Sequence, residues 1–443
     1  MNDSLKEKAL RYHQYPHPGK IAVIPTKPYS NPQDLSLAYS PGVAYPCLAI
    51  KDDPSAERTL TGRSNLVAVI SNGTAVLGLG NIGPLAAKPV MEGKALLFKI
   101  FAGLDAFDIE LDAADPEAFI AAVKAMAPTF GGINLEDIKA PECFEIERRL
   151  REECDIPVMH DDQHGTAIIS AAALLNALDI QGKDIAEIRL VVNGAGAAAI
   201  ACTRLYMALG VRRNNIVMCD SKGVLRADRP GLSGSKLEFA TDRDLHTLAD
   251  ALVGADVFLG LSVADVMTPD MLLSMAPKPI VFALANPNPE IDHDLALATR
   301  TDLIFATGRS DFSNQINNVL GFPYIFRGAL DCDASEINEA MKLAAARAVA
   351  ALTREPATDA LRRLYPDKQL EFGPKYILPK PFDKRLLPVV AVAVARAAAE
   401  SGVARRPLDD YDAYSRWLSG LIDHMNRYDS ELMLNGGSRL PKV

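Results

Sequence analysis

Paired cysteines, a basic surface stripe, long apolar runs and repeats are all missing from this 443-residue chain. None of its six cysteines stands in a C-x-x-C pair, so we expect reduced, mostly buried thiols and no zinc site. The formal charge of −9 leaves no basic patch for nucleic acid. The longest apolar run, at 386–399, contains Pro388 and Arg396 and is shorter than the roughly 20 residues that cross a bilayer. These absences predict a cytoplasmic protein without nucleic-acid or membrane partners, in which 386–399 is a buried helix.

The order of apolar segments predicts an α/β fold. Up to about residue 160, short strands and helices mix around glycine and proline, and Asn72-Gly73 predicts a hairpin over 65–80. Residues 94–103 could be a strand or the end of a helix. A helix rich in alanine and leucine begins near Thr166 and is closed by Gly182.

Five short apolar runs then alternate with helical or loop segments, at 188–194, 214–220, 255–262, 278–287 and 301–308. This alternation is typical of a doubly wound parallel sheet. We therefore expect a mixed α/β N-terminal domain over 1–160, a Rossmann-like domain with a parallel sheet over 161–385, and a helical C-terminal segment over 386–443.

Two glycine-rich stretches have spacings that can seat a pyrophosphate on a helix N-terminus, GLGNIG at 78–83 and GAGAAA at 194–199. The second follows an apolar strand and opens an unbroken helix, and Asp220 comes 21 residues after Ala199, where a ribose hydroxyl would be bound. The sequence thus assigns a dinucleotide, NAD or NADP, to the second stretch. The residues expected to bind it are Gly194, Ala195, Gly196, Ala197 and Asp220.

The first stretch lacks that context. Pro84 follows it directly, and Pro89 falls where a helix interior would be. We expect a turn there that lets the backbone pass close to another element or to a ligand.

The cofactor's identity stays open at this point. Asp220 favours the free 2′-hydroxyl of NAD, but Lys222, Arg226 and Arg229 follow closely and could bind the 2′-phosphate of NADP.

Acidic residues occur in two doublets, Glu136-Asp137 and Asp161-Asp162, with a helix expected between them. If these carboxylates converge, their repulsion calls for a divalent cation, and oxygen ligands suit Mg²⁺ or Mn²⁺. The alternative is that both doublets are solvated loop residues. His160 and His164 fit packing or supporting roles better than zinc ligation.

Two further residues could carry chemistry. Lys94 lies between a glycine and an apolar run, where burial could lower its pKa as a general base requires, unless it reaches solvent. Tyr39 precedes a Ser-Pro-Gly turn that could fix its side chain near a cleft, and the alternative is a core tyrosine.

Six motifs in chain order resemble the malic enzymes of the short bacterial type: LAYSPGVAYPC, NGTAVLGLGNIGPLAAKPVMEGKALLFK, NLEDIKAPECFEIE, HDDQHGTAIISAAALLNAL, VVNGAGAAA and SDFSNQINNVLGFPYIFRGAL. The resemblance runs from about Asp34 to Leu330 and extends towards the C-terminus. It implies oxidative decarboxylation of L-malate to pyruvate and CO₂, with reduction of NAD(P)⁺ and dependence on a divalent metal.

By matching motif, Tyr39 corresponds to the family's general acid and Lys94 to its general base. Neutral Lys94 would take the C2 hydroxyl proton as hydride leaves, and Tyr39 would protonate C3 of the enolate. The metal ligands correspond to Glu136, Asp137 and Asp162. The resemblance also places Asn286 and Asn318 near the nicotinamide and substrate, and it implies a homodimer or higher homo-oligomer.

One departure concerns an arginine that long-form members carry just before the LGLG turn and use on a substrate carboxylate. Residues 73–76 contain none, so Lys139, Arg63 or the asparagines would have to bind that carboxylate.

Two other functions remain possible from the residues. A simple NAD-dependent 2-hydroxy-acid dehydrogenase would use a histidine base and an arginine clamp, and would turn over without metal. A nucleotide-sensing protein would keep the fold without the chemistry, which the intact Tyr39, Lys94 and three acids argue against.

Overall fold

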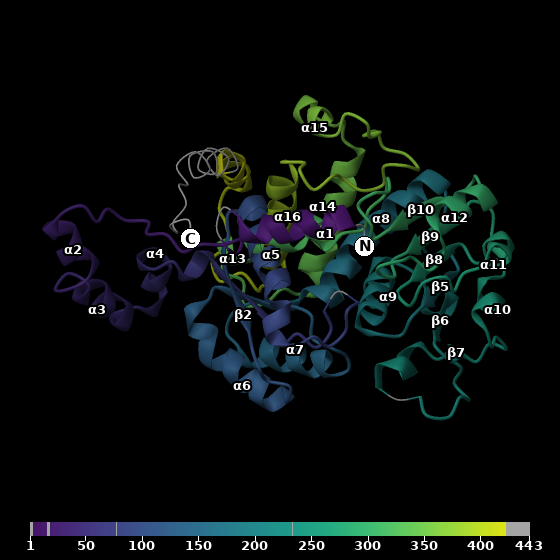
Figure 1. Ribbon diagram of the computed structural model, residues 1–443, viewed down its shortest axis with the longest axis horizontal. Coiled ribbons are helices and arrows are strands. Elements are labelled where there is room, and N and C mark those ends of the chain that lie inside the picture. Colours follow the sequence, from purple (N-terminus) through teal and green to yellow (C-terminus); the bar gives the residue numbers. More distant parts are fainter. Residues whose placement is uncertain (1–2, 16–17, 77, 233, 422–443) are drawn as a thin grey trace.

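The computed structural model describes residues 3–15, 18–76, 78–232 and 234–421. Two helix-covered sheets lie beside each other, and a small helical lobe projects from one side (Figure 1). The first 60 residues contain the helices α1 (Asp3–Gln14), α2 (Pro32–Ala38), α3 (Ala44–Asp52) and α4 (Glu57–Leu60).

The N-terminal sheet is parallel throughout and has the order β2-β1-β3-β4. Its strands are β1 (Leu66–Ser71), β2 (Asp105–Glu110), β3 (Gly132–Leu135) and β4 (Val158–His160). Its helices are α5 (Pro84–Ala102), α6 (Pro116–Met126) and α7 (Glu142–Glu153). β1 is central, and Val67 to Ile70 are fully buried on both of its faces, as an inner parallel strand requires.

The hairpin expected over 65–80 is wrong. β1 pairs in parallel with β2 and β3, and the described residues that follow Asn72 contain no returning strand. Instead the loop closes on itself, because the carbonyl of Gly73 accepts hydrogen bonds from the backbone N–H groups of Ile82 (3.2 Å) and Gly83 (3.1 Å). Asn72-Gly73 therefore ends β1, but the segment that follows the turn does not pair with this strand.

A helix does follow the first glycine stretch, contrary to the expectation from its prolines. Residues 94–103 belong to α5 up to Ala102, and Pro89 lies inside this helix. Pro84 stands in the first turn, where a missing N–H costs no intrahelical bond. Pro89 leaves the carbonyl of the exposed Leu85 without its helical donor, and its own carbonyl accepts a hydrogen bond from Lys20 Nζ at 2.7 Å.

The second sheet confirms the expected Rossmann-like arrangement. It has the order β10-β9-β8-β5-β6-β7, and all its pairings are parallel except that of β7 with β6. The strands are β5 (Leu190–Asn193), β6 (Ile216–Asp220), β7 (Gly223–Val224), β8 (Val257–Gly260), β9 (Ile280–Ala283) and β10 (Ile304–Thr307). The helices are α9 (Ala197–Leu209), α10 (Leu248–Leu252), α11 (Pro269–Ser274) and α12 (His293–Thr299).

A long buried helix, α8 (Asp161–Gln181), joins the two sheets. It starts directly after β4, packs along α9 and α14, and ends at Gly182 in the left-handed conformation. The C-terminal helices are α13 (Phe322–Asp331), α14 (Glu339–Arg354), α15 (Asp359–Leu364) and α16 (Leu386–Glu400). α16 confirms the buried helix expected over 386–399, and no described helix is long and apolar enough to span a bilayer.

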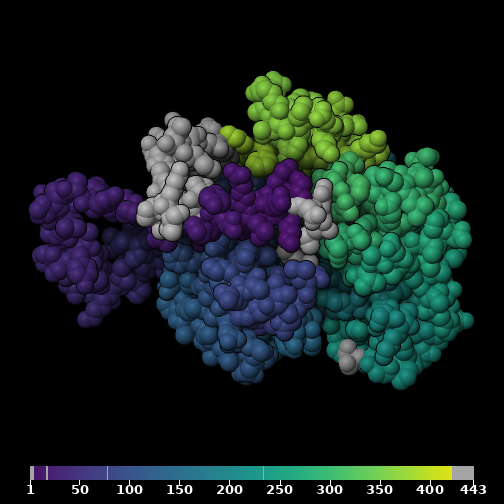
Figure 2. All heavy atoms as spheres, viewed as in Figure 1, coloured from purple at the N-terminus to yellow at the C-terminus, as the bar shows by residue number. Residues whose placement is uncertain are grey.

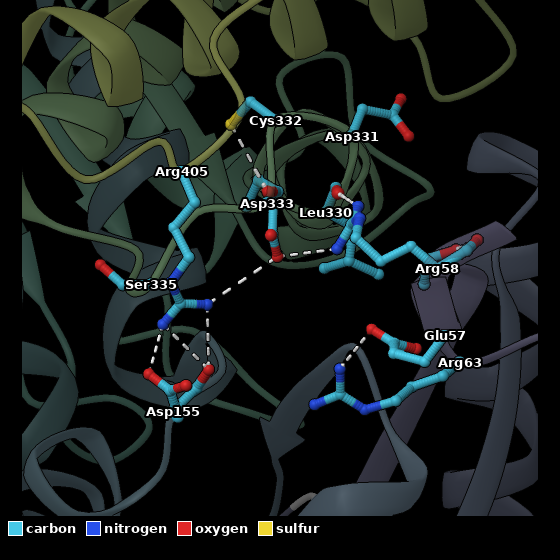
Figure 3. A network of polar contacts seen from close by, with 12 residues as sticks. Glu57, Arg58, Arg63, Asp155, Leu330, Asp331, Cys332, Asp333, Ser335 and Arg405 are labelled. Carbon is cyan, nitrogen blue, oxygen red and sulfur yellow. Dashed lines mark hydrogen bonds and ion pairs between the residues drawn. The ribbon is translucent and has the colours of Figure 1, made fainter. Parts of the chain in front are cut away.

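The projecting lobe consists of α2, α3 and α4, and it stands apart from the body on the left of Figure 2. Its base is tied down by Arg58, which donates to Asp333 Oδ1 and to the carbonyl of Leu330, both at 2.7 Å (Figure 3). Arg405 pairs with Asp333 and with Asp155, which extends this network to the chain beyond α16. The lobe is thus fixed at its base by ion pairs, while most of its surface remains exposed.

One buried amide fixes α8 in its place. Asn176 Nδ2 donates to the carbonyls of Ala350 (3.1 Å) and Ile377 (3.0 Å), and its Oδ1 accepts from Arg354 Nε (2.9 Å). We expect Asn176→Ala to lower the free energy of unfolding by about 2–4 kcal/mol, because three polar groups lose their partner away from water. Urea denaturation measures this change.

The matched control is Asn214→Ala, which removes the same side chain from an exposed position. It should stay within about 0.5 kcal/mol of the wild type. Equal urea midpoints for the two variants would show that the buried amide does not hold α8.

Candidate active site

Lys94 lies on the buried side of α5 and points at two carboxylates. Its Nζ is 2.6 Å from Asp161 Oδ2 and 2.9 Å from Glu136 Oε1, and only 11% of the side chain is exposed. It also lies 4.3 Å from the ring centre of Phe322. The alternative of a lysine that reaches solvent is therefore wrong.

The direction of the Lys94 pKa shift differs from the sequence expectation. Burial disfavours the charged amine, but the negative charges of Asp161 and Glu136 outweigh it and raise the pKa of Lys94 above its ordinary value. The sequence argument counted the burial and not the acids that face this lysine.

The two acidic doublets converge, as predicted. Glu136 and Asp137 follow β3 and Asp161 and Asp162 follow β4, so neighbouring parallel strands bring them to the same edge of the sheet. One carboxylate oxygen each from Glu136, Asp137 and Asp162 lies within 4.8 Å of the others. Asp162 Oδ2 also accepts from the backbone N–H of Asp137 (2.8 Å), which holds the two loops together.

This cluster fits a hard divalent cation. Burial and the charges of Asp162 and Asp161, opposed by Lys94, raise the pKa of Glu136 well above its ordinary value. Gathering these anions is therefore costly, and a dication would relieve the cost. The donors are all oxygens, which Mg²⁺ and Mn²⁺ prefer.

Asp161 was expected only as a member of an acidic doublet, and its contacts with Lys94 and Asn318 were not foreseen from the sequence. Besides Lys94, it meets Asn318, whose Nδ2 donates to Asp161 Oδ2 (3.1 Å), and the Oδ1 of Asn318 accepts from Thr166 (3.1 Å). The structure thus links Asn318 to the lysine site through Asp161. The sequence did offer one signal for Asp161, because this residue directly precedes Asp162, an expected metal ligand.

A buried network braces the start of α8, where both aspartates sit. His164 lies between Glu147 of α7 (Nε2–Oε2, 3.0 Å) and Lys342 of α14 (Nδ1–Nζ, 3.1 Å), and Glu147 Oε1 also accepts from the backbone N–H of His160 (3.0 Å). Burial lowers the pKa of His164 and lowers that of Lys342 to about 8. A neutral ring that donates to Glu147 and accepts from Lys342 satisfies all three groups. Glu147 and Lys342 were not foreseen from the sequence.

The second glycine stretch has the geometry of a pyrophosphate loop. Gly194 has φ +124°, and a Cβ there would overlap the carbonyl oxygen of Leu261. A Cβ on Gly196 would meet nothing within 4 Å, so the N-terminus of α9, which starts at Ala197, is open to a ligand. Ala199 is buried against the sheet, which suits the third position of the motif.

The first glycine stretch passes close to another element, as expected. A Cβ on Gly78 would lie 3.3 Å from the carbonyl oxygen of Asn286, just beyond β9. Asp220 ends β6 at the position predicted for a ribose-facing residue.

Tyr39 is not brought to Lys94 within this chain. It caps α2 in the projecting lobe and is 76% exposed, so it is not a core tyrosine. Of the residues considered for the distal carboxylate, Arg63 pairs with Glu57 at the base of the lobe (Figure 3). The backbone N–H of Lys139 bonds Thr74, next to Asp137.

Gly165 makes the contact between Asp161 and Asn318 possible. A Cβ at this position would overlap Asp161 Oδ1 and lie 2.9 Å from Asn318 Cγ. We expect Gly165→Ala to lower the free energy of unfolding by about 3–5 kcal/mol, because it drives Asp161 away from buried Lys94. Denaturant unfolding measures the loss.

Gly420→Ala is the control, because Gly420 lies in a helical stretch at 411–421, beyond α16, and a Cβ there would meet nothing within 4 Å. It should be neutral or stabilising by up to about 1 kcal/mol. If Gly165→Ala behaves in the same way, the close packing around Asp161 is not required.

Two family models match this chain, one over most of the N-terminal sheet and the other over the second sheet. Residues 18–117 and 113–151 match the malic enzyme N-terminal domain, and residues 163–370 match the malic enzyme NAD binding domain. The solved malic enzyme of Pyrococcus horikoshii Ot3 superimposes with a TM-score of 0.87 at 42% identity, over 97% of this chain and 98% of that one.

Curated relatives are more similar in sequence. The NAD-dependent malic enzyme of Rhizobium meliloti is 59% identical over 96% of this chain, which spans only 54% of that protein. This chain therefore covers about half the length of such relatives. The NADP-dependent malic enzyme of Halomonas elongata is 58% identical over 92% of this chain and 96% of its own length. On these grounds the chain belongs to the malic enzyme family.

Proposed function

We propose that this protein oxidatively decarboxylates L-malate to pyruvate and CO₂ while reducing NAD(P)⁺. One observation carries the proposal: a buried lysine lies within hydrogen-bond distance of Asp161 and Glu136, beside a cluster of carboxylates able to hold a dication. The names of the relatives, which are NAD- or NADP-dependent malic enzymes, support it.

Glu136, Asp137 and Asp162 would hold Mg²⁺ or Mn²⁺. When bound, such a cation polarises the hydroxyl and carbonyl oxygens of a chelating substrate. Lys139, two residues beyond Asp137 and joined to the loop at Thr74, is our candidate for the second substrate carboxylate.

Lys94 takes the proton of the C2 hydroxyl in this scheme. Lys94 must be neutral to accept this proton, but Asp161 and Glu136 raise its pKa and so favour the charged form. Glu136 pairs with Lys94 and would also be a ligand of the cation, and a Glu136 charge shared with a cation would hold the lysine proton less strongly. Asp161, fixed by Asn318, keeps Nζ oriented throughout.

Residues 194–197 would hold the pyrophosphate of the dinucleotide, and Asn286 and Asn318 would lie near the nicotinamide and substrate. α9 packs along α8, so the loop at the start of one helix and the acids at the start of the other are carried by two helices in contact.

Tyr39 would act as the acid that protonates the enolate, and a second copy of the chain would supply it. Tyr39 is exposed on a lobe that projects from the body, and Leu35, Leu37, Tyr45 and Leu48 of the same lobe are at least half exposed. Several exposed apolar side chains on one small lobe are consistent with a surface that binds another protein. We therefore propose a homodimer in which each lobe completes the other chain's site.

A cytoplasmic location is part of the same proposal. Five of the six cysteines are buried, and all six are free thiols, as expected for a reducing compartment. The domain limits 1–160, 161–385 and 386–443 stay predictions.

Metal removal tests the reaction class. Malate-dependent formation of NAD(P)H should fall at least about 100-fold after EDTA treatment, because the substrate loses its polarising centre, and should return with excess Mn²⁺. The absorbance of the reduced nicotinamide measures the rate of NAD(P)H formation. Undiminished turnover in EDTA would favour a simple 2-hydroxy-acid dehydrogenase.

Mixing two inactive variants tests the shared site. Lys94→Ala should abolish malate oxidation while cofactor binding persists, and Tyr39→Phe should slow protonation of the enolate more than reduction of oxaloacetate. Unfolding and refolding an equal mixture should restore about a quarter of the wild-type activity, since half of the dimers are mixed and each has one intact site.

Each variant refolded alone is the control and should remain at its own low activity. No recovery in the mixture, despite mixed dimers detected by differently tagged chains, would place Tyr39 and Lys94 of one chain in the same site.

A further inference from the structure

Glu147 occupies a position on α7 that packing alone would give to an apolar side chain. Cys143, Ile146 and Leu150 share its face of the helix and are buried in the core of the N-terminal sheet, and Glu147 itself is only 6% exposed. Burying a carboxylate there costs free energy that an aliphatic side chain would not. What the carboxylate adds is given by its contacts.

The two oxygens of Glu147 hold both ends of the stretch 160–164. Oε1 accepts from the backbone N–H of His160 (3.0 Å), and Oε2 accepts from Nε2 of His164 (3.0 Å). Asp161 and Asp162, the first two residues of α8, lie between these points. One buried side chain on α7 therefore fixes the backbone on both sides of the two acids.

Lys342 of α14 determines which nitrogen of the His164 ring carries the hydrogen. Its Nζ lies 3.1 Å from Nδ1 of His164, and a lysine ammonium can only donate. Nδ1 therefore accepts, which leaves Nε2 to donate to Glu147. Lys342 is only 7% exposed, so its contact with the ring is shielded from water.

Of the three expected metal ligands, Asp162 is the one that packing restrains least. Its side chain is 42% exposed, whereas Glu136 and Asp137 are 5% and 4% exposed. The direction of the Asp162 carboxylate thus depends strongly on the backbone at the start of α8. Mg²⁺ demands nearly ideal octahedral placement of its ligands, so a small shift of this backbone weakens binding.

We propose that Glu147 is a positioning residue for the metal site. With His164 and Lys342 behind it, Glu147 orients Asp162 towards Glu136 and Asp137 and thereby sets the affinity of this cluster for a divalent cation. The proposal rests on the proposed metal-dependent function. Groups that hold a metal ligand in place without touching the metal typically change its affinity by about 10- to 100-fold when they are removed.

Manganese binding without turnover tests this role. The electron paramagnetic resonance signal of free Mn²⁺, recorded while the ion is titrated into the full chain without malate or dinucleotide, gives the dissociation constant. Glu147→Gln should raise this constant at least about tenfold, because one of the two acceptor oxygens becomes a donor and the bond to His160 or to His164 is lost.

Two substitutions of His164 separate the hydrogen bond from the filling of space. His164→Leu removes the donor to Glu147 and should raise the Mn²⁺ dissociation constant about tenfold. His164→Gln offers an amide N–H where the ring Nε2–H stands, so it should remain within about threefold of the wild type. If the ring only filled space, the leucine variant would bind Mn²⁺ as well as the glutamine variant.

Asn176→Ala is the matched control. It removes a buried amide from the same helix, about four turns beyond Asp162, and is expected to lower the stability of the protein. Its Mn²⁺ dissociation constant should nevertheless stay within about twofold of the wild type, because the contacts of the stretch 160–164 are intact.

Three results would overturn the proposal: an unchanged dissociation constant in Glu147→Gln, equal constants in the two His164 variants, or a tenfold rise in Asn176→Ala. If Glu147→Gln does not fold, the two His164 variants decide. If the wild-type chain binds no Mn²⁺, the cluster is not a metal site, and the proposed function fails as well. Wild-type binding that Glu147→Gln does not alter would remove only the positioning role.

Discussion

Negative charge concentrated at one end of α8 is the constraint around which this molecule is built. Asp161 and Asp162 occupy the first turn of the helix, where the backbone dipole favours anions, and β3 delivers two more acids beside them. Lys94 offsets part of this charge from the opposite side. Beneath the turn, Glu147, His164 and Lys342 fix the backbone that carries it. Buried polar groups satisfied in this way keep one arrangement of the site rather than several.

The sequence pattern correctly predicted those elements whose formation depends mainly on residues close together in the chain. The strand, glycine loop and helix around Gly194 are continuous in sequence, so their order identified the cofactor region. The Asn72-Gly73 hairpin failed because turn chemistry reveals where a strand ends and not which strand becomes its neighbour. β1 is buried on both faces, which favours a central parallel position over a hairpin edge. Pro89 was misjudged because one lost helical hydrogen bond at the exposed Leu85 is tolerated within a 19-residue helix whose inner face is buried.

The sequence predicted that the acidic residues converge, but it did not predict most of the contacts that arrange the site. Glu136, Asp137 and Asp162 converge as their motifs suggested, since each follows a strand of the same sheet. Contacts between distant segments had no signal in the sequence. His164 and Lys342, for example, are 178 residues apart. Asp161 was expected only as the residue next to a metal ligand. The motif around Tyr39 carried no signal for the lobe on which this residue lies. Both the pKa direction of Lys94 and the remoteness of Tyr39 depend on tertiary packing alone.

The groups that would discriminate between cofactors and those that would perform the chemistry stand on different elements. The former gather at the end of β6, and the latter at the start of α8 and on α5. A substitution at the end of β6 therefore removes no side chain from the lysine site.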